Sequence, residues 1–146
     1  MRVLGVDPGT RKVGLAVVEA GVERPLHLEV AALEAVPARV LELCRLHGVQ
    51  AVAVGAQTGA GGVTAALRSA LPAELGPHAI DERDSSYEAR SLYWRLNPPK
   101  GLLRLIPRGM LFPPEALDGY AAAVIAGRFL EQRSRGKGHL KRHFVL

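Results

Sequence analysis

The sequence predicts an α/β fold built on one mixed sheet with helices on both faces. Three short apolar segments follow one another at the start of the chain, which is typical of an antiparallel meander. Helical and strand-like segments then alternate, which is typical of β-α-β units with parallel strands. The chain has 146 residues, of which 48% are hydrophobic and 23% are charged, as expected for a globular domain with a proper core.

Residues 2–18 predict a β-hairpin with an acid at the end of its first strand. Residues 3–6 are apolar and lead into Asp7, residues 8–10 supply a Pro-Gly-Thr turn, and residues 15–18 form the returning apolar run. A carboxylate at this place is costly to bury alone. We therefore expect Asp7 to meet water, a partner residue or a metal ion.

The remaining elements follow from apolar periodicity and from the residues that end each segment. Apolar runs predict further strands at residues 26–30, 50–55 and 77–80. Helical spacing predicts helices at residues 32–47, 63–71, 85–94 and 115–132. Ser85 and Glu88 fit a capping box at the start of the third helix. Residues 98–114 are rich in proline and apolar side chains and predict a long irregular loop, a kind of segment that is usually functional or mobile.

Charge and composition limit the partners and the location. We expect a single domain over residues 1–132, followed by a basic tail over residues 133–146.

Lys and Arg number 19 against 14 Asp and Glu, and the net charge of +5 suits a polyanionic partner. The single cysteine, Cys44, excludes an internal disulfide framework and should be buried in its helix. Without a membrane-spanning run or a secretion signal, we expect a cytoplasmic protein with no membrane partner.

Acidic residues follow two predicted strands and begin the last helix. Asp7 ends the first strand, Asp81 and Glu82 follow the last strand, and Asp118 lies near the start of the final helix. In open α/β sheets, ligands bind at the carboxyl ends of strands. Three carboxylates without a Cys or His cluster suit Mg²⁺ or Mn²⁺. Two such ions, roughly 3.5–4 Å apart, can stabilise both the attacking and the leaving oxygen in phosphodiester hydrolysis. For Asp118 alone, the competing interpretation is a helix-start residue favoured by the helix dipole.

Four segments carry a family resemblance, and they occur in the order VLGVDPGTRKVGLAV, AVAVG, AIDERDSSYEAR and ALDGYAAAVIAGRFLE. Together they resemble the YqgF/RuvX family of RNase H-like nucleases, relatives of the RuvC Holliday-junction resolvases. The resemblance implies an RNase H-like fold with a five-stranded mixed sheet, antiparallel over strands 1–3 and parallel over strands 4–5. It also implies metal-dependent cleavage that leaves a 5′-phosphate and a 3′-hydroxyl. It puts the catalytic, metal-binding acids on Asp7, Glu82 and Asp118, around two Mg²⁺ or Mn²⁺ ions.

The chain departs from the family pattern at several positions. RuvC-like proteins carry an acid after the fourth strand, but residues 55–58 contain none, so the second acid comes from the Asp81-Glu82 pair. Alternation along a strand places Asp81 and Glu82 on opposite faces, and we favour Glu82 while leaving Asp81 open. Asp84 is a candidate cap or extra ligand, and Glu115 is a candidate fourth acid.

Several basic and polar residues are candidate nucleic-acid contacts. They are Thr10, Arg11, Lys12, Arg83, Lys100, Arg104 and Arg108. Arg83 is equally suited to pairing with one of the acids beside it. The aromatic residues Tyr87, Tyr93 and Trp94 could stack on unpaired bases, but we expect them to pack within the protein.

The leading hypothesis is a metal-dependent endonuclease that acts on branched or structured nucleic acid, above all in the resolution of Holliday-junction DNA. One alternative is a ribonuclease that processes the 5′ end of pre-16S rRNA. Another is a non-catalytic nucleic-acid-binding module, against which the retained acids argue. Because a junction has two scissile strands, a homodimer is a candidate state, with the apolar residues of 101–112 as its candidate interface.

Overall fold

The computed structural model describes residues 1–57 and 60–144, with side chains described as far as residue 136. Its centre is a five-stranded sheet with the strand order β3-β2-β1-β4-β5. β1 pairs antiparallel with β2, and β2 with β3, whereas β1–β4 and β4–β5 are parallel pairs. The strands are β1 (Arg2–Asp7), β2 (Lys12–Glu19), β3 (His27–Ala32), β4 (Ala51–Gly55) and β5 (His78–Ile80). The predicted fold class is confirmed.

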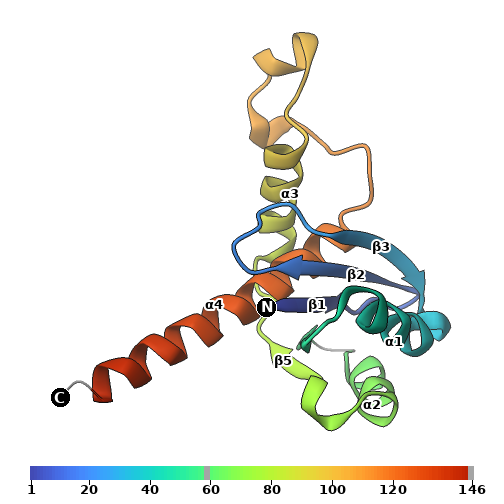
Figure 1. Cartoon of the computed structure of the whole chain (residues 1–146). Helices are drawn as coiled ribbons and strands as arrows, with labels where there is room; N and C mark the ends of the chain where they lie inside the picture. The colour runs from blue at the N-terminus through green and yellow to red at the C-terminus, as the bar shows by residue number, and fades with distance from the viewer. Residues whose placement is uncertain (58–59, 145–146) are drawn as a thin grey trace.

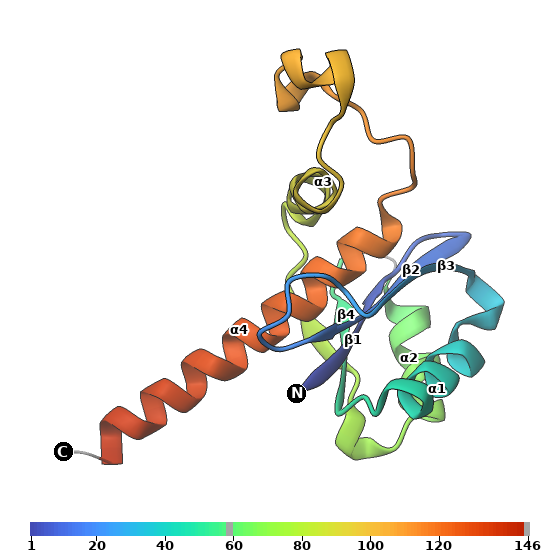
Figure 2. The ribbon, with the colours of Figure 1, turned by 45° about the horizontal axis from the view of Figure 1, so that its top comes forward.

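Helices cover both faces of this sheet (Figures 1 and 2). On one face, α1 (Val36–His47) and α2 (Gly61–Ala70) pack on the strands, and α1 is preceded by a short 3-10 turn at Leu33–Ala35. On the other face, α4 (Asp118–Phe144) crosses the strands, and α3 (Ser85–Leu96) packs against α4. Two apolar cores result, one on each face. Cys44 lies in the α1 core as expected, and burial raises the pKa of its thiol to about 11.

Two glycines let α4 approach the sheet unusually closely. A Cβ atom at Gly5 in β1 would overlap the carbonyl oxygen of Ala122, and one at Gly14 in β2 would overlap the carbonyl oxygen of Asp118. Because neither glycine carries a side chain, the helix backbone rests directly on the adjacent strands β1 and β2. This contact places the first turn of α4 beside the end of β1, where Asp7 lies.

The start of α3 and both ends of α4 differ from the boundaries that the sequence predicts. The N-cap of α3 is Asp84, with a left-handed φ of 61° and no side-chain cap, while Ser85 is already helical; the predicted capping box is therefore wrong. The last helix begins at Asp118 rather than residue 115 and continues to Phe144 rather than ending at residue 132. Residues 133–144, expected as a tail, extend this helix, which the Glu131–Arg135 pair (4.0 Å) supports one turn apart.

A proline-rich segment projects from the end of α3, and we call residues 98–114 the arm (Figure 1). It contains two short 3-10 turns, Gly101–Leu105 and Arg108–Met110. Most of its apolar side chains are exposed, among them Leu102, Leu105, Met110 and Phe112. Arg90 of α3 fastens the arm by donating hydrogen bonds to the carbonyl oxygens of Gly109 and Leu111, and its guanidinium lies 5.0 Å from the centre of the Phe112 ring.

Among the described residues, none of the helices is long and apolar enough to cross a membrane.

Candidate active site

Asp7 and Glu82 meet at the edge of the sheet where the parallel strands end. Asp7 is the last residue of β1, and Glu82 lies two residues beyond the end of β5. Their carboxyl groups lie close enough for each to affect the other electrostatically. Burial raises the pKa of Asp7 to about 7, with further contributions from the charge and hydrogen bond of Glu82 and from the charge of Asp118.

Glu82 is held in place by the backbone that follows β4. The residue is only 4% exposed, and its Oε1 accepts a hydrogen bond from the backbone N–H of Gln57 at 2.9 Å. A Cβ atom at Gly55 would overlap the Glu82 carboxylate. The segment at the end of β4 therefore contributes no acid of its own. It contributes the Gln57 N–H as a hydrogen-bond donor and, at Gly55, the space that the carboxylate of Glu82 occupies.

The neighbouring acid, Asp81, points elsewhere. It is exposed and pairs with Arg83 at 2.9 Å, and it also accepts a hydrogen bond from the Arg83 backbone N–H at 3.0 Å. These bonds lower the pKa of Asp81 below its usual value, as expected for a carboxylate that stays ionised. Of the two adjacent acids, Glu82 is the one that lies beside Asp7.

Asp118 is the first residue of α4 and contributes to the site through its charge. Its side chain is about one third exposed, and Oδ2 lies 3.8 Å from Nζ of Lys12 on the facing hairpin. Within the part of the chain that the structure describes, no three His, Cys, Asp or Glu side chains are arranged as a ready-made metal site. The arrangement is instead two neighbouring carboxyl groups, Asp7 and Glu82, with Asp118 nearby and paired to Lys12.

The chemistry of this donor set fits a hard divalent cation. All the donors are carboxylate oxygens, which Mg²⁺ and Mn²⁺ prefer. Burial and the neighbouring Glu82 raise the pKa of Asp7, and a divalent cation held by these carboxylates would favour their ionised forms and remove their repulsion. The backbone N–H of Gln57 already fixes one of the two side chains. Asp118 would join the set by leaving its exposed ion pair with Lys12.

The structure also shows the surroundings of the other residues that the sequence suggested for the site. Thr10, Arg11 and Lys12 are exposed on the hairpin that follows Asp7. Asp84 occupies the N-cap of α3 without a side-chain cap bond. Glu115 lies outside α4, and its charge helps to raise the pKa of Tyr93, after burial of that phenol, rather than the pKa of Asp7.

The arm carries the remaining three candidates, Lys100, Arg104 and Arg108, all of them exposed. Of the three aromatic residues, Tyr93 and Trp94 are buried as expected, with their rings packed edge to face. Tyr87 is 75% exposed, so the expectation that it packs within the protein is wrong. It faces outward from the first turn of α3, where no core residue covers it.

Sequence reasoning missed Gly55 and the Gln57 backbone as supports of Glu82. The available signal was a fully apolar strand, residues 51–54, that ends in glycine and lacks the acid expected there. Reasoning from residue types looks for side chains that carry chemistry. It does not register a backbone N–H or a missing Cβ.

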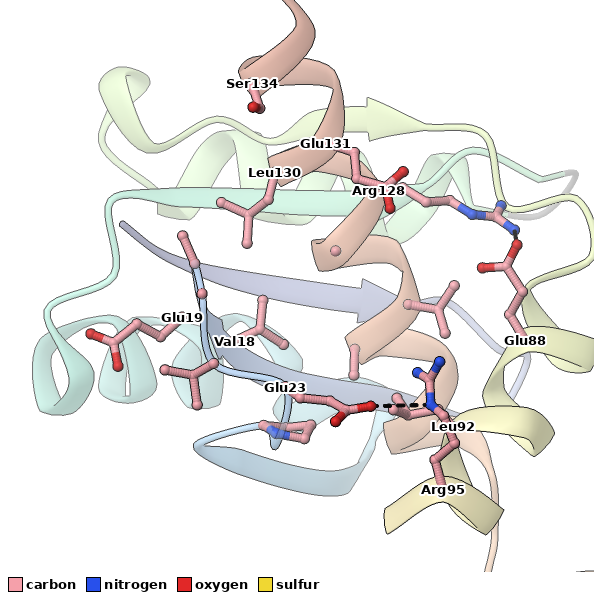
Figure 3. A pocket seen from close by; sticks show the side chains of 17 residues that line it. Val18, Glu19, Glu23, Glu88, Leu92, Arg95, Arg128, Leu130, Glu131 and Ser134 are labelled. Atoms are coloured by element: carbon pink, nitrogen blue, oxygen red, sulfur yellow. Dashed lines mark ion pairs between the residues drawn. The ribbon is translucent and has the colours of Figure 1, made fainter.

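A cavity of about 550 Å³ lies away from these acids, between the turn after β2, α3 and α4 (Figure 3). Figure 3 shows two ion pairs across it, Glu23 with Arg95 at 3.2 Å and Glu88 with Arg128 at 3.0 Å. Glu19 and Glu131 also line it, so acids outnumber bases around the cavity. A phosphate group would be repelled there, and this cavity does not suit a nucleic acid.

The comparisons with known proteins agree with the observed fold. Two structures of RuvC from Thermus thermophilus share the fold at 23% identity. One matches with a TM-score of 0.59 and covers 86% of this chain and 90% of that chain. The other, in complex with a Holliday junction substrate, has a TM-score of 0.58 and covers 90% and 96%. No family model matches the sequence.

A curated relative from Opitutus terrae, named "Putative pre-16S rRNA nuclease", is 34% identical over 149 residues, which is 91% of this chain and 93% of the relative. The fold is that of an RNase H-like protein with acids at the sheet edge where the parallel strands end. The chain belongs to the YqgF/RuvX family of RNase H-like nucleases. It is accordingly an enzyme that hydrolyses phosphodiester bonds.

Proposed function

We propose that this protein is a divalent-metal-dependent endonuclease of branched or structured nucleic acid, with Asp7, Glu82 and Asp118 as its metal-binding, catalytic acids. The observation that carries the proposal is the pair formed by the half-buried Asp7 and the buried Glu82 at the sheet edge. Two adjacent carboxylates are unfavourable as ions unless a cation lies between them. A nuclease of this fold therefore has a reason to keep them together.

Each acid has a distinct part in this proposal. When bound, Mg²⁺ or Mn²⁺ ions would activate water and stabilise the charge that develops at the phosphorus. Asp7, whose pKa is about 7 in the metal-free protein, would be an ionised ligand once a cation is bound. Glu82 stays oriented because the Gln57 N–H holds Oε1. Asp118 supplies a third carboxylate at the start of α4, and releasing it frees Lys12 for a substrate phosphate.

The charges around the acids suit a polyanionic substrate. Thr10, Arg11 and Lys12 are exposed on the hairpin that begins directly after Asp7, where they would contact phosphates next to the scissile bond. Lys100, Arg104 and Arg108 extend the basic character along the arm. Arg83 is paired with Asp81 and would have to leave that partner to join them.

Two substrates remain candidates. Holliday-junction DNA is favoured by the likeness in fold to RuvC, one of whose structures contains such a junction. Pre-16S rRNA is favoured by the Opitutus terrae relative, which is named for that substrate and is more similar in sequence. Junction cleavage at both strands would also require a homodimer, whereas cleavage of a single RNA strand would not. Both substrates fit the cytoplasmic location that the sequence predicts.

The experiment that tests the proposal offers the wild-type protein four labelled substrates: a four-way DNA junction, duplex DNA, single-stranded DNA and a structured precursor of 16S rRNA. Each is incubated with Mg²⁺, with Mn²⁺ and with EDTA. We expect metal-dependent cleavage of the junction or of the RNA that leaves a 5′-phosphate, and no cleavage with EDTA. Binding that falls steeply with salt, without cleavage under any of these conditions, would indicate a non-catalytic module instead.

A further inference from the structure

A second cavity lies between α3 and the arm, on the side of α3 that faces Arg108. It measures about 230 Å³, less than the roughly 300–1,000 Å³ of sites for drug-sized ligands. Its walls come from α3, through Tyr87, Arg90, Trp94 and Arg95, and from the arm, through Arg108. The volume suits a group as small as a phosphate with part of one nucleoside, rather than a large cofactor.

The charge of this cavity is opposite to that of the cavity in Figure 3. Three arginines line it and no acid does. Arg90 is held by the carbonyl oxygens of Gly109 and Leu111, which orient the guanidinium without neutralising its charge. Arg95 pairs with Glu23 through an exposed contact of 3.2 Å, which is a weak interaction in water. Arg108 is exposed and forms no ion pair with any side chain that the structure describes.

An aromatic ring stands beside these charges. Tyr87 is 75% exposed and projects from the first turn of α3, where it gains nothing from burial. Trp94 forms a more buried wall one to two turns further along the same helix. Arginines for the backbone together with an open aromatic face are the two components that sites for unpaired nucleic-acid strands combine.

We propose that this cavity binds an unpaired nucleic-acid strand, with a backbone phosphate against Arg108 and Arg90 and a base stacked on Tyr87. The inference rests on the proposed function and adds a second contact for the same substrate. α3 begins at Ser85, three residues after Glu82, so the helix connects the acids directly to this cavity. A strand that leaves the acids along α3 reaches Tyr87 first and Arg108 next. Such unpaired strands occur both at branched DNA and beside the helices of structured RNA.

The test measures binding in EDTA, where no cleavage occurs, by fluorescence anisotropy with a labelled single-stranded oligonucleotide over a range of salt concentrations. The variants are Arg108→Gln and Tyr87→Leu, both at exposed positions whose change should leave the fold intact. Arg45→Gln is the control, because it removes the same charge from an exposed position of α1 on the opposite face of the sheet. Cleavage by each protein with Mn²⁺ is measured in parallel.

Tyr87→Leu should weaken binding by about 5-fold or more, because a stacked base is lost, and leave the salt dependence unchanged. Arg108→Gln should weaken binding and lower the salt slope by about one ion, and Arg45→Gln should change neither. The inference is overturned if Tyr87→Leu binds like the wild type, or if Arg108→Gln behaves like Arg45→Gln, while the wild type still cleaves. If the wild type neither binds nor cleaves nucleic acid, the proposed function fails with it.

Discussion

The carboxyl group of Asp7, at the end of β1, lies beside that of Glu82, which follows β5, and burial together with this neighbour raises the pKa of Asp7 to about 7. Two features of the fold impose this contact. β1 and β5 run parallel on either side of β4, so their carboxyl ends meet at one edge of the sheet. Gly55 and the backbone N–H of Gln57 then seat the Glu82 side chain against Asp7. The contact stores a repulsion that a proton or a cation relieves.

The metal-free protein should lose stability as the pH rises from about 4 to above 7. The pKa of Asp7 is about 7 in the folded protein against the ordinary value of 3.8 in an unfolded chain, so over this range the folded state binds more protons than the unfolded chain. The stabilising contribution of protonated Asp7 is fully present below about pH 4, where Asp7 is also protonated in the unfolded chain. It decreases as the pH rises and is lost once the pH exceeds the pKa of Asp7 in the folded protein. Asp7→Asn cannot ionise, so it should be more stable than the wild type at pH 8 and about equal at pH 4. Urea unfolding in EDTA at both pH values measures the difference, and a wild type that stays the more stable protein at pH 8 would contradict it.

Mg²⁺ or Mn²⁺ should stabilise the wild type at pH 8. A cation that binds only the folded state adds about 2.7 kcal/mol when its concentration is 100 times its Kd, which for a chain of this size corresponds to several degrees in Tm. Asp7→Asn removes one ligand and the repulsion that the cation relieves, so it should show little of this shift. Thermal unfolding with and without each ion, reversed by EDTA, gives the comparison. An equal rise in Tm for both proteins would place the cation elsewhere.

Gly55→Ala should disable the site by displacing Glu82. The new methyl group would overlap the Glu82 carboxylate and lie about 3.0 Å from the side chain of Ile125, so Glu82 must move. We expect a loss of about 1–3 kcal/mol in stability and a fall in activity of the order of 10²-fold.

Gly127→Ala in α4 is the matched control for that substitution. Nothing lies within 4 Å of the Cβ position at Gly127, and alanine favours a helix by about 0.5–1 kcal/mol over glycine. The control should therefore be slightly more stable than the wild type and fully active. Urea unfolding and a cleavage assay separate the two variants. Full activity in a folded Gly55→Ala protein would show that cleavage does not require the Glu82 carboxylate at its position in this structure.

Arg90→Ala should release the arm from α3. Its guanidinium donates to two arm carbonyls and lies over the Phe112 ring, so the substitution removes the contacts that hold residues 109–112. We expect a small loss of global stability, about 1–2 kcal/mol, but a clear increase in the rate at which trypsin cleaves after Lys100, Arg104 and Arg108. Arg45→Ala on α1 serves as the control. Leu111 is 6% exposed and belongs to the core on the α4 side of the sheet, so an unchanged cleavage rate in the arm would mean that this burial suffices to hold it.

Much of the fold and part of the site followed from the sequence. The strands and α1 were predictable because their apolar residues repeat with the period of the element, and Asp7 was predictable because it ends such a strand. The choice between Asp81 and Glu82 depended on the register of a three-residue strand, which alternation alone does not set. The cap of α3 differed because Asp84 adopts a left-handed φ that the S-x-x-E pattern does not reveal. The exposure of Tyr87 depended on how α3 packs against α4 rather than on the residue type.

The central claim is that the carboxylates of Asp7 and Glu82 form the catalytic metal site, and an assay of three proteins tests it most directly. The wild type, Asp7→Asn and Asp81→Asn are compared for Mn²⁺-dependent cleavage of the four-way junction and the precursor RNA, with binding of both substrates measured in EDTA. Asp81 is the matched control because it is an exposed acid in the same segment that pairs with Arg83 instead of joining the site. We predict that Asp81→Asn cleaves like the wild type, whereas Asp7→Asn binds normally but loses at least about 10²-fold in rate. Metal-dependent cleavage by Asp7→Asn at the wild-type rate would contradict the account.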